Sequence, residues 1–288
     1  MDWDFWMLSQ DEMTYRMAAI PEKLLAWYDA GNRKLPWRDK PTPYRVWISE
    51  IMLQQTRVQA VLPYFERFIA ALPDVQALSE VPDDQLMKLW EGLGYYSRAK
   101  NLKRAAKIII CEMDGVIPDT AEQLKLLPGI GEYTAGAIAS IAYQRRTPAV
   151  DGNVLRVLAR VFRNEADILN TGVKRHYRDL LTQMLPSRAG DFNQALMELG
   201  AVVCAPNGEP RCDACPLAAI CIAHQDGCET ALPVKALKAK RKVEQHVLTL
   251  IICKNEILIK KRPESGVLAG LWAFYDMEHP EFFGMSVL

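Results

Sequence analysis

Apolar residues recur at helical spacing through most of this chain. Between residue 17 and about residue 228, alanine, leucine and long polar residues follow the spacing of a series of short helices, and strand-like alternation is nearly absent. Proline and glycine breaks divide the series at Pro41–Pro43, Pro82, Gly92–Gly94, Pro118 and Gly129–Gly131. The pattern predicts a mainly α fold, with residues 1–228 as one helical domain.

The stretch from Asn153 to Arg163 is typical of the series. Three arginines, at positions 156, 160 and 163, fall on one side of the expected helix. The other side is apolar and predicts a core-facing stripe, made of Val154, Leu155, Val157, Leu158, Val161 and Phe162.

The pattern changes after residue 228. Residues 229–244 form a basic, polar connector, and beyond it the runs HVLTLIIC and EILIKKR flank Lys254–Asn255. Two strand-like runs around a two-residue turn predict a β-hairpin. Residues 245–288 are too few for an independent β-domain of ordinary size, so we expect a short β region here.

Charge alone gives little information about partners, because the chain has 35 Lys+Arg and 35 Asp+Glu. Two basic runs, at residues 98–107 and 235–242, fit either solvated surfaces or contacts with nucleic acid. The N-terminus lacks the basic and apolar regions of a signal peptide, and no uncharged stretch approaches the roughly 20 residues of a membrane helix. We therefore expect a cytosolic protein without a membrane partner.

Four of the seven cysteines crowd together: Cys204, Cys212, Cys215 and Cys221 give the pattern C-x7-C-x2-C-x5-C. Such spacing predicts a metal site rather than a disulfide framework. Four thiolates can hold either a zinc ion or an iron–sulfur cluster. Because zinc ribbons usually pair two C-x2-C units and only one is present, the spacing favours a 4Fe–4S cluster with a structural or DNA-docking role.

The run Leu127-Pro128-Gly129-Ile130-Gly131 lies between two expected helices, one ending near Leu126 and one starting near Glu132. Two glycines one residue apart permit positive φ and a tight hairpin whose backbone N–H groups point outward. With the N-terminus of the next helix, these donors make a site for a phosphate. A plain interhelical turn is the alternative, but the leading LP and the following TAGAIAS favour DNA-backbone binding.

These features are joined by longer motifs: PWR (36–38), SEIMLQQTRV (49–58), GLGYYSRA (92–99), LPGIGEYTAGAI (127–138) and VDGNV (150–154). Together with the cysteines they resemble the adenine DNA glycosylases of the endonuclease III superfamily, over about residues 20–225. EILIKKRP and GLWAF also resemble the start of that family's Nudix-like domain. The resemblance implies a six-helix barrel lobe (about 38–143), a 4Fe–4S cluster lobe (about 15–37 and 144–228), a linker (229–244) and a partial Nudix-like region (245–288).

The resemblance implies hydrolysis of adenine flipped out of a duplex opposite 8-oxoguanine or guanine by a monomeric enzyme. Glu50, set among apolar residues that favour a protonated carboxyl, is the implied general acid on adenine N7. Asp151, which we also expect to cap a helix, is implied to stabilise the cationic sugar. Asn153 and Tyr133 are implied to complete the pocket.

The residue at position 133 distinguishes two branches of this superfamily. Endonuclease III-like pyrimidine glycosylases carry a lysine in the equivalent G-x-K-T-A, which attacks the sugar and allows strand cleavage. Here the run is GEYTA, so we expect a monofunctional glycosylase.

Further roles follow from the resemblance alone. Gln54, Gln55 and Tyr95 match residues that enter the duplex, and the residues that match the adenine pocket are Arg38, Leu53 and Gln194.

The chain departs from the family in two places. Seven residues separate the first two cysteines where six are usual, and most of the Nudix-like domain is absent, which predicts weaker discrimination of 8-oxoguanine from guanine. Three alternatives remain open: an endonuclease III-like glycosylase and lyase, a non-catalytic lesion-binding module, and an oxidant sensor. The presence of both Glu50 and Asp151 favours the enzyme.

Overall fold

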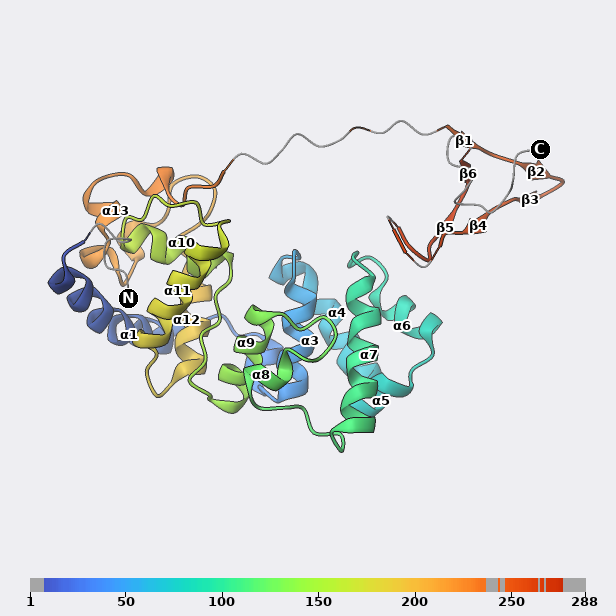
Figure 1. Cartoon of the computed structure of the whole chain (residues 1–288), viewed down its shortest axis with the longest axis horizontal. Coiled ribbons are helices and arrows are strands. Elements are labelled where there is room, and N and C mark those ends of the chain that lie inside the picture. Colours follow the sequence, from blue (N-terminus) through green and yellow to red (C-terminus); the bar gives the residue numbers. More distant parts are fainter. Residues whose placement is uncertain (1–7, 237–242, 244–246, 264, 267, 277–288) are drawn as a thin grey trace. The chain divides into compact units, whose positions relative to one another are not determined.

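The computed structural model describes residues 8–236, 243, 247–263, 265–266 and 268–276. The chain divides into two compact units, residues 1–236 and 237–288. Among the described residues, the first unit is helical and the second carries short strands (Figure 1). The mainly α fold predicted from the apolar spacing is therefore confirmed.

The helices of the first unit are short, as the proline and glycine breaks predict. They are α1 (Gln10–Gly31), α2 (Pro36–Asp39), α3 (Pro43–Leu53), α4 (Val58–Ala71), α5 (Val75–Glu80), α6 (Asp83–Trp90), α7 (Ser97–Glu112), α8 (Ala121–Leu124), α9 (Glu132–Tyr143), α10 (Gly152–Val161), α11 (Thr171–Met184), α12 (Ala189–Val202) and α13 (Ile222–Gln225). Three 3₁₀ turns, η2 (Cys212–Ala214), η3 (Ala218–Ile220) and η4 (Glu229–Ala231), surround α13.

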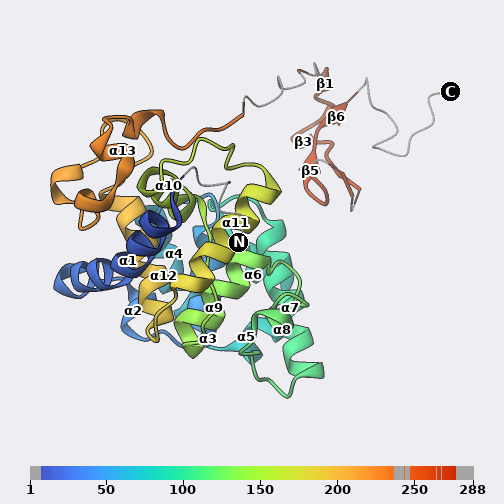
Figure 2. The ribbon, with the colours of Figure 1, turned by 60° about the vertical axis from the view of Figure 1, so that its left-hand side comes forward.

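Two hydrophobic cores hold these helices. Buried side chains from residues 35–149 form the first core, and those from residues 13–28 and 154–232 form the second. In both views α1, α10, α12 and α13 lie together, while α6 and α7 lie apart from them (Figures 1 and 2). Helix α12 packs against α1, α9 and α10, and its Met197 contacts both cores. Helix α12 is therefore common to both cores.

Helix starts explain the placement of two functional segments. The Thr42 side chain accepts a hydrogen bond from the backbone N–H of Arg45, and Pro43 occupies the first helical position of α3. Asp151 caps α10 by accepting the backbone N–H of Val154 at 2.8 Å, which confirms the expected cap. These caps fix where α3 and α10 begin, and so determine where Glu50 and Asn153 lie along the two helices.

The polar side of α10 differs from the sequence-based expectation. Its apolar stripe is buried as predicted, but Arg156 and Arg160 are buried as well, at 6% and 3% exposed. Both guanidinium groups donate to backbone carbonyls of the irregular segment that follows α12. Carbonyls in such a segment lack helical partners, and a buried carbonyl is costly without a donor. The arginines supply those donors.

The second unit holds six strands of two residues each among its described residues. They are β1 (Leu248–Thr249), β2 (Ile252–Cys253), β3 (Glu256–Ile257), β4 (Lys260–Lys261), β5 (Trp272–Ala273) and β6 (Tyr275–Asp276). They pair antiparallel as β1–β6, β2–β3 and β4–β5. The predicted hairpin is present as β2 and β3, with Lys254 at φ 55° in its turn. Apolar side chains on both strands are exposed among the described residues: Ile252 is 62% exposed and Ile257 48%.

A search of the described residues for a helix long and apolar enough to cross a membrane finds none.

Candidate active site and cysteine cavity

Glu50 is a buried carboxyl on α3. Its side chain is 6% exposed and its neighbours on the helix, Ser49 and Ile51, are buried too. Burial raises the pKa of Glu50 to about 7, because a charged carboxylate loses its hydration there. The apolar run around position 50 therefore produces the environment that the sequence predicts. A carboxyl with this pKa can give and take a proton near neutral pH.

Tyr133 lies in the first turn of α9 and donates its hydroxyl proton to Glu50 Oε2 at 2.6 Å. This bond favours the ionised carboxylate and moderates the effect of burial on the pKa of Glu50. Burial, together with the charges of Glu50 and Asp151, raises the pKa of the Tyr133 phenol well above its usual value. Tyr133 is therefore a neutral hydrogen-bond donor. Both carboxyl groups act on it electrostatically, which places the three side chains in one site.

Asp151 has both carboxylate oxygens engaged. Oδ1 accepts the Val154 N–H, and Oδ2 accepts the Asn153 side-chain amide at 2.6 Å. Burial raises the pKa of Asp151, while these hydrogen bonds and the charge of Arg156 act in the opposite direction. An ionised aspartate is a capable partner for a positive charge, and here the hydrogen bonds favour that form.

A chain of hydrogen bonds continues from Asp151 to the cysteine segment. Asn153 Oδ1 accepts from the Arg156 guanidinium at 2.9 Å, and the same guanidinium donates to the Cys204 carbonyl at 2.8 Å. Gly200 lies against Asn153 so closely that a Cβ at position 200 would sit 2.5 Å from the Asn153 Cβ. The position of Asp151 is therefore fixed through Asn153 and Arg156 by the segment at Cys204. Sequence analysis missed Arg156, which it placed on the polar side of the helix.

The hairpin at residues 127–131 forms between α8 and α9. Leu127 and Ile130 are buried and anchor it, while Gly129 and Gly131 are exposed. Only Gly129 takes a positive φ, 82°; Gly131 is extended at φ −90° and is the N-cap of α9. Gly129 therefore uses the positive φ that a glycine permits, whereas Gly131 does not. The exposed hairpin leads directly into the N-terminus of α9, and helix N-termini are positions at which phosphates bind.

Gln55 and Tyr95 share an uncommon backbone conformation. Their φ values are 58° and 47°, in the left-handed region that non-glycine residues rarely adopt, and both side chains are exposed. Strain at exposed polar and aromatic residues is typical of functional sites. Gln54 is half-buried and its amide lies 3.5 Å from the Thr134 hydroxyl on α9.

Arg38 is held in an ion-pair network. Its guanidinium lies 2.9 Å from Glu198 on α12, and Arg33 pairs with the same carboxylate at 2.6 Å. Burial acts to raise the pKa of Glu198, but the two arginines outweigh it and the pKa lies below its usual value. The charge of Arg38 also acts to lower the pKa of Glu50. Leu53 packs against the first core, and Gln194 is half-buried on α12.

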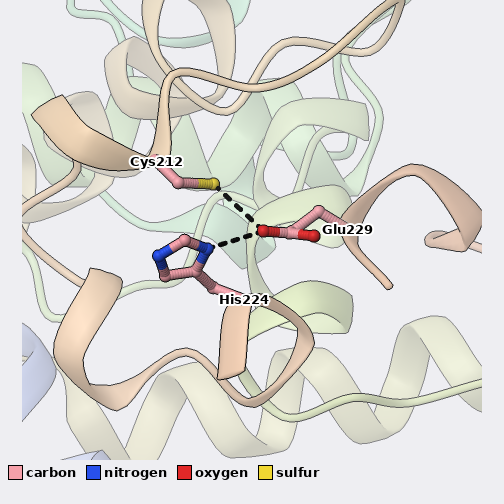
Figure 3. A group of neighbouring side chains, drawn as sticks. All are labelled: Cys212, His224 and Glu229. Carbon is pink, nitrogen blue, oxygen red and sulfur yellow. Dashed lines mark hydrogen bonds and ion pairs between the residues drawn. The ribbon is translucent and has the colours of Figure 1, made fainter. Parts of the chain in front are cut away.

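All four clustered cysteines line one cavity, together with apolar side chains of α10 and α12. Arg160 donates to Cys204 Sγ at 3.2 Å. His224 and Glu229 also line the cavity, and Glu229 Oε1 lies 2.6 Å from His224 Nδ1 and 3.5 Å from Cys212 Sγ (Figure 3). The ligand atoms of Cys212, His224 and Glu229 lie within 4.8 Å of one another. Four thiols around one cavity suit an iron–sulfur cluster, and the group of Cys212, His224 and Glu229 is an alternative set of metal ligands.

Comparisons with known proteins agree with this fold. Residues 48–183 match the family model of the HhH-GPD superfamily of base excision DNA repair proteins. Among solved structures, a thermostable thymine-DNA glycosylase superposes with a TM-score of 0.67 at 25% identity, covering 74% of this chain and 98% of that one. An endonuclease III bound to DNA superposes with a TM-score of 0.63 at 21% identity, covering 77% and 99%. The helical fold is thus that of the helix–hairpin–helix glycosylases.

Relatives that are similar in sequence identify the family within this class. The adenine DNA glycosylase of Buchnera aphidicola (strain APS) is 37% identical over 90% of this chain and 74% of its own length. The rat and human adenine DNA glycosylases are 40% and 39% identical over 90% of this chain. The chain spans 60% of the rat protein and 57% of the human one. This chain belongs to the adenine DNA glycosylase family.

Proposed function

We propose that this chain is a monofunctional DNA glycosylase that, as a monomer, removes adenine mispaired with 8-oxoguanine or guanine in duplex DNA. The observation that carries the proposal is the buried Glu50 carboxyl, which has a pKa of about 7 and accepts a hydrogen bond from Tyr133. Asp151, the N-cap of α10, acts electrostatically on the same carboxyl. A carboxyl that can donate a proton, together with a second carboxyl held by hydrogen bonds, suits the cleavage of a glycosidic bond.

The proposed reaction begins at Glu50. Its carboxyl gives a proton to adenine N7, the bond between the base and C1′ breaks, and the bonding electron pair leaves with the base. The Glu50 carboxylate then takes a proton from the water that attacks C1′, which restores the acid. Tyr133 keeps the carboxyl in place through its 2.6 Å hydrogen bond and, being neutral, competes for no proton.

Asp151 is proposed to stabilise the sugar once it carries a positive charge. The helix N-terminus and Asn153 hold both oxygens of the carboxylate, so the group is oriented before the charge develops. Tyr133 takes the place of the attacking lysine of the lyase branch, so release of adenine leaves the DNA strand intact. Gln54, Gln55 and Tyr95 are proposed to enter the duplex, while Leu53, Arg38 and Gln194 line the adenine pocket.

The contacts to the DNA backbone are assigned to the hairpin. Leu127 anchors it in the core, and the exposed backbone at Gly129 and Gly131 faces outward at the start of α9. Such a contact holds a phosphate without reading the sequence.

We also propose that Cys204, Cys212, Cys215 and Cys221 hold a 4Fe–4S cluster. When bound, the cluster joins the two ends of an irregular segment of about 18 residues and supplies the charge that the four thiolates balance. Arg156 and Arg160 attach this segment to α10, the helix that carries Asp151. The cluster therefore has a structural role in this proposal.

Iron analysis distinguishes the four-cysteine site from the group of Cys212, His224 and Glu229. Cys204→Ser is expected to lose most of its bound iron and its visible absorption, and to unfold at a lower temperature. Cys204 lies outside the three-residue group, so retention of metal in this variant would favour that group instead. Cys111→Ser, at an exposed position on α7, is the control and should keep its iron.

Single-turnover cleavage of labelled duplexes tests the enzymatic proposal. We expect strand breaks at adenine opposite 8-oxoguanine and opposite guanine, and only after alkali treatment. Alkali-independent breaks at thymine glycol would assign the chain to the endonuclease III branch, and binding without cleavage would indicate a lesion-binding module. The ratio of the two adenine rates measures how strongly this chain discriminates 8-oxoguanine from guanine.

A further inference from the structure

Arg98 is a buried cation that the proposed mechanism does not use. Sequence analysis places it in a basic run that suits a solvated face or a DNA contact, but its side chain is only 8% exposed. It lies in the first turn of α7, where the helix dipole disfavours a positive charge, and burial lowers its pKa. A cation held at such a position needs strong compensation, and the surrounding carbonyl groups provide it.

One guanidinium nitrogen of Arg98 donates to the end of α3. Nη1 lies 2.8 Å from the Ile51 carbonyl, 3.0 Å from that of Met52 and 2.8 Å from that of Gln54. The last carbonyls of a helix have no partner within the helix. Arg98 therefore caps α3 from a different helix and fixes the turn that leads into Gln55.

The other nitrogen donates to a second turn. Nη2 lies 3.0 Å from the Leu93 carbonyl and 3.2 Å from that of Gly94. The backbone N–H of Arg98 also donates to the Tyr95 carbonyl at 2.9 Å, and the guanidinium lies 5.7 Å from the Tyr95 ring centroid. Arg98 thereby fixes the turn at residues 93–96, which carries Tyr95.

Arg98 thus joins the two turns whose exposed residues are strained. Gln55 follows the first turn and Tyr95 lies in the second, and both have positive φ. A small cavity bounded by Gln54 and Arg98 also reaches Pro128 and Gly129 of the hairpin. Strained residues persist only where the surrounding structure holds them.

We propose that Arg98 is a positioning residue that holds the Gln54–Gln55 turn and the Tyr95 turn as one preorganised unit for extruding the target base. This inference rests on the proposed function. A planar guanidinium can donate to both turns at once, whereas an ammonium group is compact and cannot span them in the same way. Replacing Arg98 with lysine keeps the charge and removes the link.

The test uses Arg98→Lys beside a matched control, Arg45→Lys. Arg45 donates to one backbone carbonyl, that of Pro36, and like Arg98 lies over an aromatic ring, Phe65, but it donates to neither turn. Base extrusion is followed by the fluorescence of 2-aminopurine placed opposite 8-oxoguanine. Because hydrogen bonds from charged donors are stronger than neutral ones, we expect Arg98→Lys to lower the extruded fraction about tenfold. Arg45→Lys, which alters neither turn, should leave extrusion within about twofold.

Hydrogen exchange without DNA provides a second readout that needs no activity. Arg98→Lys is expected to speed amide exchange in residues 54–56 and 93–96 together, while Arg45→Lys leaves both unchanged. Unaltered exchange and extrusion in Arg98→Lys would overturn the inference. Failure of the unaltered chain to release adenine would overturn the proposed function instead, and the exchange data would still decide whether Arg98 holds the two turns.

Discussion

Replacing Glu50 with glutamine is expected to slow single-turnover release of adenine by about 10²- to 10⁴-fold, the usual contribution of a general acid. Glutamine keeps the shape of the side chain and can still accept the Tyr133 hydrogen bond, but it cannot give up a proton. Affinity for a duplex with a non-hydrolysable adenine analogue should be preserved. Glu66→Gln, at an exposed position on α4, is the control and should keep the full rate.

The pH dependence of the unaltered chain supports the same assignment. Because Glu50 acts in its protonated form, the rate should fall as pH rises through about 7. Removing the Tyr133 hydroxyl with Tyr133→Phe deletes a bond that lowers the pKa of Glu50, so this fall should move to higher pH. A rate that does not change between pH 6 and pH 8 would contradict the assignment of Glu50 as the acid, the interval being set by a pKa of about 7.

Stability should respond to pH through the same group. The pKa of Glu50 is 4.5 when unperturbed and about 7 in the folded chain, so between these values the folded form binds more protons than the unfolded form. The free energy of unfolding therefore falls as pH rises through this window. Glu50→Gln removes this dependence, and the inactive variant should be more stable than the unaltered chain above pH 7. Thermal unfolding against pH measures both.

Asp151→Asn is expected to lower the rate of adenine release by about a thousandfold, similar to the loss of a preorganised electrostatic contact elsewhere. Asparagine is as good a helix cap as aspartate, so α10 keeps its start. The asparagine side chain, however, carries no charge to stabilise the sugar. Its NH2 group would face the NH2 group of Asn153, because the Asn153 side-chain oxygen already accepts a hydrogen bond from Arg156. Stability should fall by only about 1 kcal/mol, the net worth of one hydrogen bond.

A matched control separates capping from catalysis. Asp74 caps α5 by accepting the Ala77 N–H at 2.8 Å and is exposed. Asp74→Asn should change the melting temperature as little as Asp151→Asn does and leave the excision rate intact. If Asp151→Asn also retained the full rate, the side chain would be a cap and nothing more.

Local sequence was sufficient to predict features that depend on neighbours along the chain. The apolar residues around Glu50 lie on the same helix, so its burial follows from the periodicity of α3. Asp151 caps a helix that begins at the next residue, and the hairpin turn at Lys254 lies between two adjacent apolar runs. The family resemblance rests on equally local motifs, and the relatives confirm it.

The buried arginines could not be predicted in this way. Arg156 donates to carbonyls 44 and 48 residues away, and Arg160 to one 72 residues away. Arg98 caps a helix that ends about 44 residues earlier in the chain. Periodicity places an arginine on the polar side of its helix, but the acceptors that bury it belong to segments that meet only in the folded chain. Arg33 pairs with Glu198 across 165 residues for the same reason.

The packing of α12 against both hydrophobic cores has a consequence for how the helical unit unfolds. Helix α12 packs against α9 of the first core and α10 of the second, and its Met197 contacts both. Opening either core exposes one side of α12 and removes packing from the other. The helical unit should therefore melt in a single cooperative transition. A destabilising substitution beside the cysteine cavity would then reduce the population of chains in which the first core, with Glu50, is folded. No change at Glu50 itself would be needed.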